Sequence, residues 1–530
     1  MKAHLMYPAR DFDAGQESPP GADDLMQDLE LGTLLAAMAG GDAFLLGVAR
    51  TALLCGPADP ETITYRQQAL RDCLAQPAVI REVYDVAVQA ITGEKRIWWG
   101  LMSRYPEAIL HRSVEVMQLF VAALKRLRRI ADAHASGFRS DAFTAFFTMI
   151  TEELGNDYFA AVDAHLKRLK FAGGVLVSAS LGEGNAGTGY VLRTPAGTRR
   201  KLSEVIGVGN RSAYTITISD RDEAGARALS ELSGRGINHV ANALAQSADH
   251  ILGFLQLLRA ELAFYIGALN VHERLAAVGG SACFPVPLPT AGAAFSASWL
   301  YDPCLALSTG TAVTGNDVSA DGASLVMITG ANQGGKSTFL RSVGVAQLMM
   351  GCGMFVAATA LRASVCHGLF THYKREEDAS MTSGKLDEEL ARMSGITARI
   401  TPGSVLLCNE SFASTNEREG SEIARQIVRA LRGAGVRVLY VTHLYDLARS
   451  LYAEAGTSAV FLRAGREPGG RRTFRLLPGE PLPTSHGQDV YAEVFGALAG
   501  AAPSAPPAAP GDGSISPATA HDGIDLPDTA

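Results

Sequence analysis

The sequence has little of what marks a secreted or membrane-spanning protein. Its seven cysteines never stand in Cys-x-x-Cys spacing, which argues against a disulfide framework or a zinc site and indicates reduced thiols. The first 25 residues carry five acidic side chains and no apolar stretch of signal-peptide length. Because 18 uncharged apolar residues never follow one another, we expect no membrane span and a cytoplasmic location.

The chain also lacks an excess of positive charge. It has 47 Lys and Arg residues against 54 Asp and Glu residues, which gives a formal net charge of -7. A general nucleic-acid coat protein needs a surplus of cations to neutralise phosphates, so the composition excludes that class. Any contact with DNA must therefore be regional.

Length and hydrophobic pattern predict several domains. At 530 residues the chain exceeds what one core usually serves. Residues 1–24 and 497–530 are rich in small and turn-forming residues, and we expect both to be disordered tails. Between them we predict a helical domain over 25–300, with a small β-rich insertion at about 173–220, and an α/β domain over 301–496.

Periodicity supports this division. A broad apolar stripe at helical spacing runs from Val114 to Leu127, and helical character returns from Glu223 to about Val278. Between these segments, short β-branched runs at 175–177, 190–192 and 214–218 alternate with turn residues. The pattern predicts a small β-insertion inside a helical frame.

The strongest motif is a glycine-rich loop between a predicted strand at 325–329 and an apolar helix that follows it. Its spacing, Gly-x-x-x-x-Gly-Lys-Ser, suits a phosphate-binding loop, because glycines let backbone N–H groups turn toward an anion at a helix N-terminus. Lys336 can then reach the β- and γ-phosphates of ATP, and Ser337 can ligate Mg²⁺. An ordinary glycine-rich turn is the alternative. The candidate nucleotide-binding residues are Gly330, Ala331, Asn332, Gln333, Gly334, Gly335, Lys336, Ser337 and Thr338.

Two further predicted strands end in residues suited to hydrolysis. The run from Ser404 stops at Asn409 and Glu410, and Glu410 is the candidate general base that would activate water. Asn409 is the candidate metal ligand through its carbonyl oxygen, although it lacks the charge of the Asp that is usual there. His443 follows the strand at 436–441, where it can sense or hydrogen-bond the γ-phosphate. The alternative for Glu410 is a solvated strand end.

Taken together, these residues resemble the MutS family of DNA mismatch-recognition ATPases. The resemblance is strong over about 300–495 and weaker over 25–300. The family's phosphate loop has an Asn two residues after the first Gly and ends in Gly-Gly-Lys-Ser-Thr, as Asn332 and residues 334–338 do here. Other segments fall in family order, at 301–305, 316–317, 353–357, 369–371, 383–385, 410–415, 442–446 and 485–487.

The resemblance implies an ABC-type P-loop ATPase that uses ATP and Mg²⁺, with Asn316 in the strand on the adenine side. It further implies a helical core with levers and a DNA clamp, a homodimer whose ATPase domains complete each other's sites, and a nucleoid-associated repair role beside a repair-protein partner. Three departures from the family pattern stand out. No mismatch-reading segment is recognisable, the signature segment at 383–389 is altered, and Val313 or a neighbour replaces the aromatic that stacks on adenine.

Basic runs mark the candidate DNA contacts. They are Lys125–Arg129, Lys167–Lys170 and, in the β-insertion, Arg199–Lys201, although such runs are usually solvated helix faces. Trp98 and Trp99 suit base stacking, but paired aromatics on a helix more often belong to a core.

The sequence therefore predicts an ATP hydrolase that binds mismatched or otherwise irregular DNA and couples ATP to dimer and clamp conformation. Two alternatives remain open. One is a nucleotide-switched binding module with little turnover, because Asn409 and the altered signature weaken hydrolysis. The other is an ATPase that acts on branched DNA, a ribosome or a protein partner.

Overall fold

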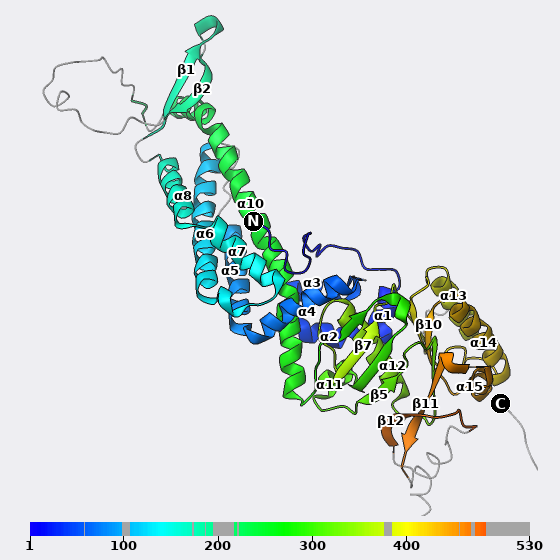
Figure 1. Ribbon diagram of the computed structural model, residues 1–530. Helices are drawn as coiled ribbons and strands as arrows, with labels where there is room; N and C mark the ends of the chain where they lie inside the picture. Colours follow the sequence, from blue (N-terminus) through cyan, green and yellow to red (C-terminus); the bar gives the residue numbers. More distant parts are fainter. Residues whose placement is uncertain are drawn as a thin grey trace, which may run out of the picture.

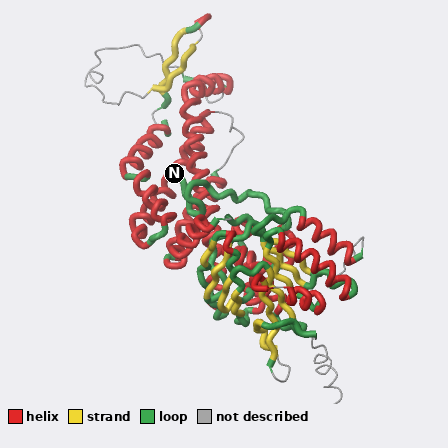
Figure 2. Tube along the Cα trace, turned by 45° about the vertical axis from the view of Figure 1, so that its right-hand side comes forward, coloured by secondary structure: helices red, strands yellow, loops and turns green. Residues whose placement is uncertain are grey.

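The computed structural model describes residues 1–57, 59–97, 106–171, 174–185, 187–193, 217–219, 222–375, 384–454, 456–467 and 472–483. The chain forms an elongated helical arm and an α/β head (Figure 1). We use "arm" for α4–α8, β1, β2 and most of α10, and "head" for α1–α3 and everything from β3 onward. Figure 2 shows strands in the interior of the head, whereas the arm is helical up to a hairpin at its far end. The mixed helical and α/β fold class is thus confirmed.

The arm is built around two long helices, α6 and α10, that lie side by side. Their parallel course follows from apolar stripes that face each other, with Phe120 and Leu255 fully buried. Asp222 caps α10 by accepting a hydrogen bond from the backbone N–H of Gly225. The elements are α4 (Pro60–Ala75), α5 (Pro77–Arg96), α6 (Pro106–His134), α7 (Asp141–Glu153), α8 (Asn156–Leu169), β1 (Leu176–Leu181), β2 (Gly187–Arg193) and α10 (Glu223–Ala277).

The helix α10 connects the far end of the arm with the head. Its 55 residues correspond to a rod of about 80 Å. By length and composition alone it could cross a membrane, but 72% of its most apolar window is buried inside the protein, as in the core helix of a folded domain. The absence of uncharged apolar runs predicts no membrane span, yet this helix, itself predicted at 223–278, meets the length and composition test. Its burial inside the protein accounts for its apolar composition.

The head contains a six-stranded sheet and a four-stranded sheet. Its helices are α1 (Ala22–Asp28), α2 (Leu31–Ala39), α3 (Ala43–Leu54), α11 (Pro303–Thr309), α12 (Lys336–Gly351), α13 (Lys385–Thr397), α14 (Glu417–Gly433) and α15 (Tyr445–Glu454). Its strands are β3 (Val286–Leu288), β4 (Phe295–Leu300), β5 (Asn316–Ser319), β6 (Leu325–Thr329), β7 (Ala360–Ser364), β8 (Leu369–Tyr373), β9 (Val405–Asn409), β10 (Arg437–Val441), β11 (Ala459–Arg466) and β12 (Arg472–Pro478).

The larger sheet has the order β12-β11-β6-β10-β9-β8, and its neighbours are parallel except for β12 at one edge. Alternate residues of its central strands enter two different cores. Ile328 and Leu407 belong to the core shared with α12 and the arm, while Met327 and Leu406 belong to the core under α14 and α15. Because the strands are parallel, the carboxyl ends of β6, β9 and β10 meet at one edge.

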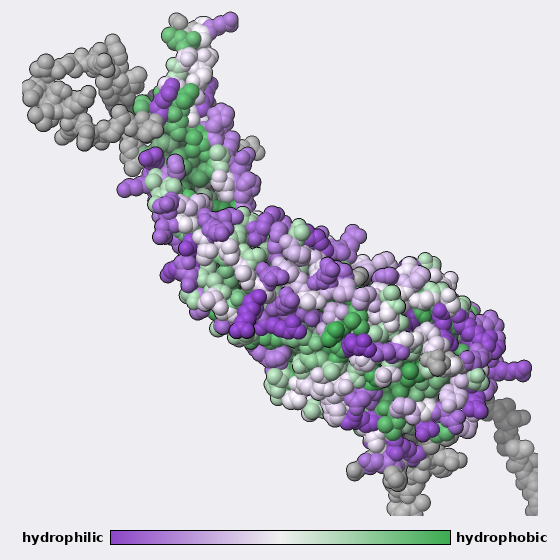
Figure 3. All heavy atoms as spheres, viewed as in Figure 1, coloured by the Kyte–Doolittle hydropathy of each residue, from purple (hydrophilic) through white to green (hydrophobic). Residues whose placement is uncertain are grey.

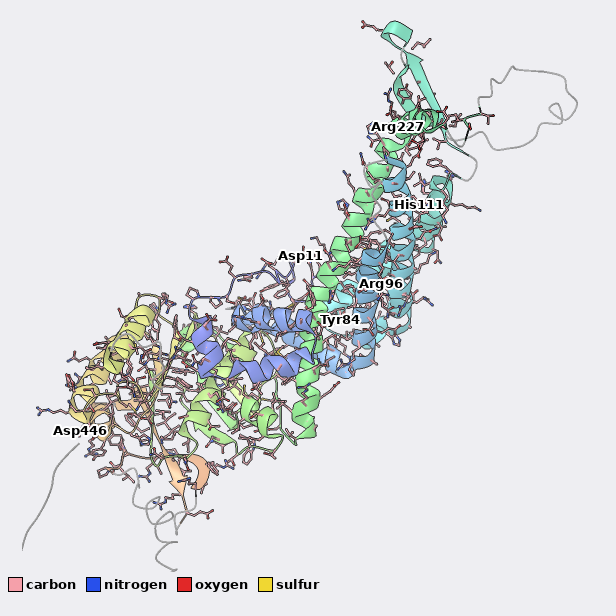
Figure 4. All side chains as sticks on the ribbon, turned by 180° about the vertical axis from the view of Figure 1, so that it is seen from behind. Asp11, Tyr84, Arg96, His111, Arg227 and Asp446 are labelled. Carbon is pink, nitrogen blue, oxygen red and sulfur yellow. The ribbon has the colours of Figure 1, made fainter. Side chains whose placement is uncertain are left out.

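The expectation of a disordered N-terminal tail over residues 1–24 is wrong. Leu5 and Met6 are fully buried, and α1 already begins at Ala22. The carboxylate of Glu261 in α10 accepts hydrogen bonds from the backbone N–H groups of Leu5 (2.6 Å) and Phe12 (3.2 Å). Figure 4 shows Asp11 on this segment beside α10. The few apolar residues find a surface made by distant helices, which composition alone does not reveal.

The other predicted boundaries also need adjustment. The smaller sheet has the order β3-β7-β4-β5, so β3 and β4 belong to the head although they precede residue 301. In the insertion, β1 and β2 form an antiparallel hairpin. The expected third strand at 214–218 lies mostly outside the described residues, as do 194–216 and the predicted tail at 497–530.

Candidate functional site

The glycine-rich loop lies between the buried strand β6 and the helix α12, at the carboxyl edge of the larger sheet. Gly330 and Gly335 have φ values of 116° and 86°, which L-residues with side chains rarely adopt. A Cβ atom at Gly334 would lie 2.7 Å from Cβ of Ala464 in β11. The glycines are therefore required both by backbone conformation and by the close approach of β11.

Lys336 is folded across this loop. Its Nζ donates hydrogen bonds to the backbone oxygens of Gly330 (3.1 Å) and Ala331 (2.9 Å), and it lies 3.3 Å from Nε2 of His443. Burial lowers the pKa of Lys336, and the nearby charge of Glu410 acts in the opposite direction. The ammonium group is thus held at the mouth of the loop, within reach of an anion bound there.

Ser337 and Asn409 bring two candidate metal ligands together. The Ser337 hydroxyl donates a hydrogen bond of 2.9 Å to Oδ1 of Asn409, although the residues are 72 positions apart. Both offer neutral oxygens, the ligand type that Mg²⁺ accepts beside water and phosphate oxygens. No group of three or more His, Cys, Asp and Glu side chains that could hold a metal ion occurs among the described residues. A cation here would depend on phosphate oxygens for most of its charge compensation.

Glu410 and His443 form a hydrogen-bonded pair beside the loop. Nε2 of His443 lies 3.1 Å from Oε1 of Glu410, and the backbone N–H of His443 donates to Oε2 at 3.1 Å. Burial raises the pKa of Glu410, against the effects of Lys336, the His443 N–H and Lys374. Burial, with Lys336 and Lys374, lowers the pKa of His443 to about 4, so its ring is neutral at pH 7 and the pair is a hydrogen bond.

A cavity of about 420 Å³ opens beside the loop, on the side of β5 and α11. Gly334, Lys336 and Ser337 line one side of it, and Thr311, Val313 and Phe474 are among the residues that line the rest. This cavity is the place where a base and ribose attached to loop-bound phosphates would fit. Phe474 in β12 is a site residue that the sequence reasoning missed. Phe474 lies in the edge strand β12, and nothing in its immediate sequence distinguishes it as a site residue.

Asn316 lines the cavity, but its amide is engaged elsewhere. Its Nδ2 donates to the backbone oxygen of Phe474 (3.2 Å), and its Oδ1 accepts from the N–H of Leu476 (2.7 Å). Asn316 thus fastens β5 to β12. In this arrangement its amide positions Phe474, and direct recognition of a nucleotide by Asn316 stays a prediction.

The remaining sequence predictions fall on different parts of the chain. Ser383, Arg199–Lys201, Trp98, Trp99 and Ser485–Gly487 lie outside the described residues. In the run at 125–129, Lys125 pairs with Asp163, and Arg128 pairs with Asp132 and also donates to two backbone oxygens. These cations serve intramolecular contacts, which weakens their case as a DNA patch.

The far end of the arm presents a different surface. Lys167, Arg168 and Lys170 are exposed where α8 ends, and Leu169 and Phe171 pack with β2 and α10 in a small separate core. Apolar side chains gather around the base of the hairpin (Figure 3), where Leu229 and Leu232 are exposed. Basic and apolar groups therefore lie together at this end.

Comparisons with known proteins match both parts of the chain. The family "MutS2 N-terminal domain" matches residues 58–278, from the start of α4 to the end of α10. The family "MutS domain V" matches residues 326–480, which begin in β6 and include the loop, Glu410, His443 and β12.

Curated relatives carry the same family name. A DNA mismatch repair protein MutS of Chloroflexus aurantiacus is 31% identical over 172 residues, which are 31% of this chain and 18% of that protein. One of Parasynechococcus marenigrum is 27% identical over 237 residues (41% and 26%), and a DNA mismatch repair protein MutS 2 of Haloarcula marismortui is 28% identical over 192 residues (35% and 20%). The matched part thus spans 18 to 26% of the length of these relatives. Since family matches cover the arm and the head in turn, the chain is a MutS-related protein.

Proposed function

We propose that this protein binds ATP with Mg²⁺ and hydrolyses it, and that the arm responds to the nucleotide state. The observation that carries the proposal is the meeting of Lys336, the Ser337–Asn409 pair and the Glu410–His443 pair at one sheet edge. These residues come from the ends of three parallel strands, the position where open α/β sheets bind ligands. The relatives named for DNA mismatch repair support the same reading.

Each group has a distinct role in the proposed reaction. Backbone N–H groups of the loop and the N-terminus of α12 hold the phosphates, and Lys336 offsets charge on the β- and γ-phosphates. Glu410 accepts a proton from the attacking water, and His443 orients that carboxylate while remaining neutral. Phe474 lies where it can stack on the base.

Ser337 and Asn409 would hold Mg²⁺. The ion, when bound, neutralises charge on the β- and γ-phosphate oxygens. The hydroxyl and the amide oxygen fit an ion that retains several waters, but neither is negatively charged. For this reason a nucleotide-switched binding module with little turnover remains a second candidate. The loop and the cavity beside it can bind ATP without a well-held cation, whereas rapid hydrolysis needs one.

The helix α12 supplies a direct route from the nucleotide to the arm. It begins at Lys336, and directly after its end the backbone oxygen of Cys352 accepts a hydrogen bond from Nη1 of Arg66 in α4 (3.2 Å). Within α12, Arg341 pairs with Asp302 and with Glu30. A shift of α12 on phosphate binding would therefore be felt at the base of the arm.

The partner that we propose is DNA, mismatched or otherwise irregular. The exposed Lys167, Arg168 and Lys170 at the far end of the arm suit contacts to phosphates, which are independent of sequence. A homodimer, a nucleoid-associated cytoplasmic location and a repair-protein partner complete the proposal at the level of the family. Branched DNA, a ribosome or a protein complex are the alternative targets.

The test is steady-state ATPase activity of the purified chain with homoduplex, mismatched and branched DNA at one modest salt concentration. We expect ATP turnover that one of the irregular DNAs stimulates, and that falls when Lys167, Arg168 and Lys170 are replaced by Gln. ATP binding without any DNA response would favour a ribosome-directed or protein-directed switch. Absence of ATP binding would contradict the proposal.

A further inference from the structure

The candidate base Glu410 stands at the start of an unusual turn. Glu410 and Phe412 have φ values of 55° and 61°, in the left-handed region that residues with a Cβ atom rarely occupy. Such a conformation is unfavourable for these residues and persists only where the surroundings hold it. The direction of the Glu410 carboxylate therefore depends on what fixes this turn.

Ser411, the residue between them, is fully buried and bonded to both strands that flank β9. Its hydroxyl lies 2.7 Å from the backbone oxygen of His372 in β8 and 2.8 Å from Nδ1 of the same residue. Its backbone oxygen accepts a hydrogen bond of 2.7 Å from the Tyr440 hydroxyl in β10. The turn is thus held from two sides at one residue.

His372 contacts more than Ser411. It is fully buried, its ring stacks on Phe412 with centroids 5.4 Å apart, and its Nε2 lies 2.9 Å from the backbone oxygen of Glu389 in α13. A carbonyl oxygen only accepts, so Nε2 carries the proton. Burial lowers the pKa of His372 to about 4, so the ring is neutral at pH 7 and Nδ1 carries no proton. The single hydroxyl proton of Ser411 is therefore shared between the backbone oxygen and Nδ1 of His372.

The helix α13 is fastened to the same turn a second time. Oε1 of Glu389 accepts a hydrogen bond of 3.1 Å from the Ser414 hydroxyl. The helix α13 begins at Lys385, so residues 385–389 of the altered signature segment, Glu389 among them, form its first part. A displacement of α13 would therefore act on the turn through Glu389, at both His372 and Ser414.

We infer that His372 is a positioning residue for hydrolysis: through Ser411 it fixes the turn that aims Glu410, and through Glu389 it links that turn to α13. The inference rests on the proposed function, because it assigns a role within ATP hydrolysis. His372 touches neither the glycine-rich loop nor the cavity beside it in the contacts of the described residues. Its loss should therefore change kcat and leave nucleotide binding intact.

The variants separate the two connections of His372. His372→Phe keeps an aromatic ring against Phe412 but removes the two hydrogen bonds of the imidazole, to Ser411 and to Glu389. Ser411→Ala removes only the hydroxyl in the turn. His372→Asn keeps an acceptor near Nδ1 and loses the bond to Glu389. His367→Asn is the matched control, since Nδ1 of His367 also bonds a backbone oxygen, that of Pro402, at the opposite end of β8.

Steady-state ATP hydrolysis of the full chain gives kcat and KM for each variant, with circular dichroism and thermal melting as checks on folding. We expect kcat to fall about 10- to 100-fold in His372→Phe and Ser411→Ala, the usual cost of a misplaced catalytic group, with KM within about twofold of the parent. His372→Asn should keep more of the parent kcat than His372→Phe, and His367→Asn should match the parent.

Three results would overturn the inference. One is a folded Ser411→Ala protein whose kcat equals that of the parent. This variant keeps the inference testable if His372→Phe fails to fold. Another is a rise in KM that accounts for the whole loss of kcat/KM. In both cases the proposed function would stand, provided that Lys336→Ala is inactive. If the parent and Lys336→Ala release phosphate at the same rate, the proposed function and this inference both fall.

Discussion

The hydroxyl of Ser337 is hydrogen-bonded to the side-chain oxygen of Asn409, at 2.9 Å. Ser337 is the second residue of α12, directly after the loop lysine, and Asn409 ends β9. Their contact brings the two protein ligands of the proposed Mg²⁺ site together. Because both oxygens are neutral, the site is poorer in negative charge than a Ser–Asp pair in the same place would be.

Asn409→Asp should therefore lower the Mg²⁺ concentration that gives half-maximal ATP hydrolysis, by about tenfold, since a carboxylate adds charge where an amide has none. The serine hydroxyl can still donate to it. Titration of Mg²⁺ at fixed ATP measures this value. If turnover at saturating Mg²⁺ also rises sharply, the parent is a switch with little hydrolysis; an unchanged Mg²⁺ requirement would exclude Asn409 as a ligand.

Phe474→Ala should raise KM for ATP by about tenfold, because stacking on an aromatic side chain contributes about 1–3 kcal/mol per base. Phe474 is 48% exposed and lines the cavity, so it can receive a base without rearrangement of the core. Leu477→Ala is the control, as Leu477 is exposed on the same strand and does not line the cavity. Equal KM values for both variants would remove Phe474 from the site.

The pH dependence of hydrolysis should follow Glu410. A general base acts only when ionised, so kcat should be present above the raised pKa of Glu410 and be lost as pH falls through it. Lys374 lowers this pKa, so Lys374→Met should move the acid limb to higher pH. We would measure kcat from pH 5 to 9 at constant ionic strength, with Lys95→Met as control, since Lys95 is exposed in α5 and far from the loop. If the kcat of Lys374→Met falls at the same acidic pH as that of the parent, Glu410 is not the group whose ionisation controls hydrolysis.

Glu261 should make stability depend on pH. Burial raises its pKa to about 7 from an ordinary 4.5, so its contribution to the folded state is fully present below pH 4.5 and is lost as pH rises through 7. Relative to Glu261→Gln, the parent should lose about 3 kcal/mol of unfolding free energy between pH 4.5 and 8. The variant itself should be less stable at low pH, because Gln offers one acceptor oxygen to the N–H groups of Leu5 and Phe12. Urea unfolding of both proteins at several pH values measures this difference. The same change of unfolding free energy with pH in the parent and in Glu261→Gln would contradict it.

What the sequence predicted well was local. The glycine-rich loop, with a strand before it and a helix after it, follows from nine consecutive residues, and the structure has β6 and α12 at those places. Glu410 and His443 could be proposed as neighbours of the loop because parallel strands bring their carboxyl ends to one edge. The catalytic roles themselves stay predictions.

What the sequence did not reveal depends on contacts between distant segments. Residues 1–24 look like a tail by composition, yet Leu5 is buried because Glu261, 256 residues away, accepts its N–H. The sequence near Ser411 indicates only a loop, because its hydrogen-bonding partner His372 lies 39 positions away in β8. Phe474 belongs to the cavity only because Asn316 fastens β12 to β5.

The most direct test of the central claim is single-turnover hydrolysis of ATP by the parent, Lys336→Ala and Glu410→Gln, with nucleotide binding measured beside it. We predict that the parent hydrolyses ATP, that Lys336→Ala binds it poorly, and that Glu410→Gln binds it normally but cleaves it about 10²- to 10⁴-fold more slowly. Cleavage by Glu410→Gln at the parent rate would contradict the account.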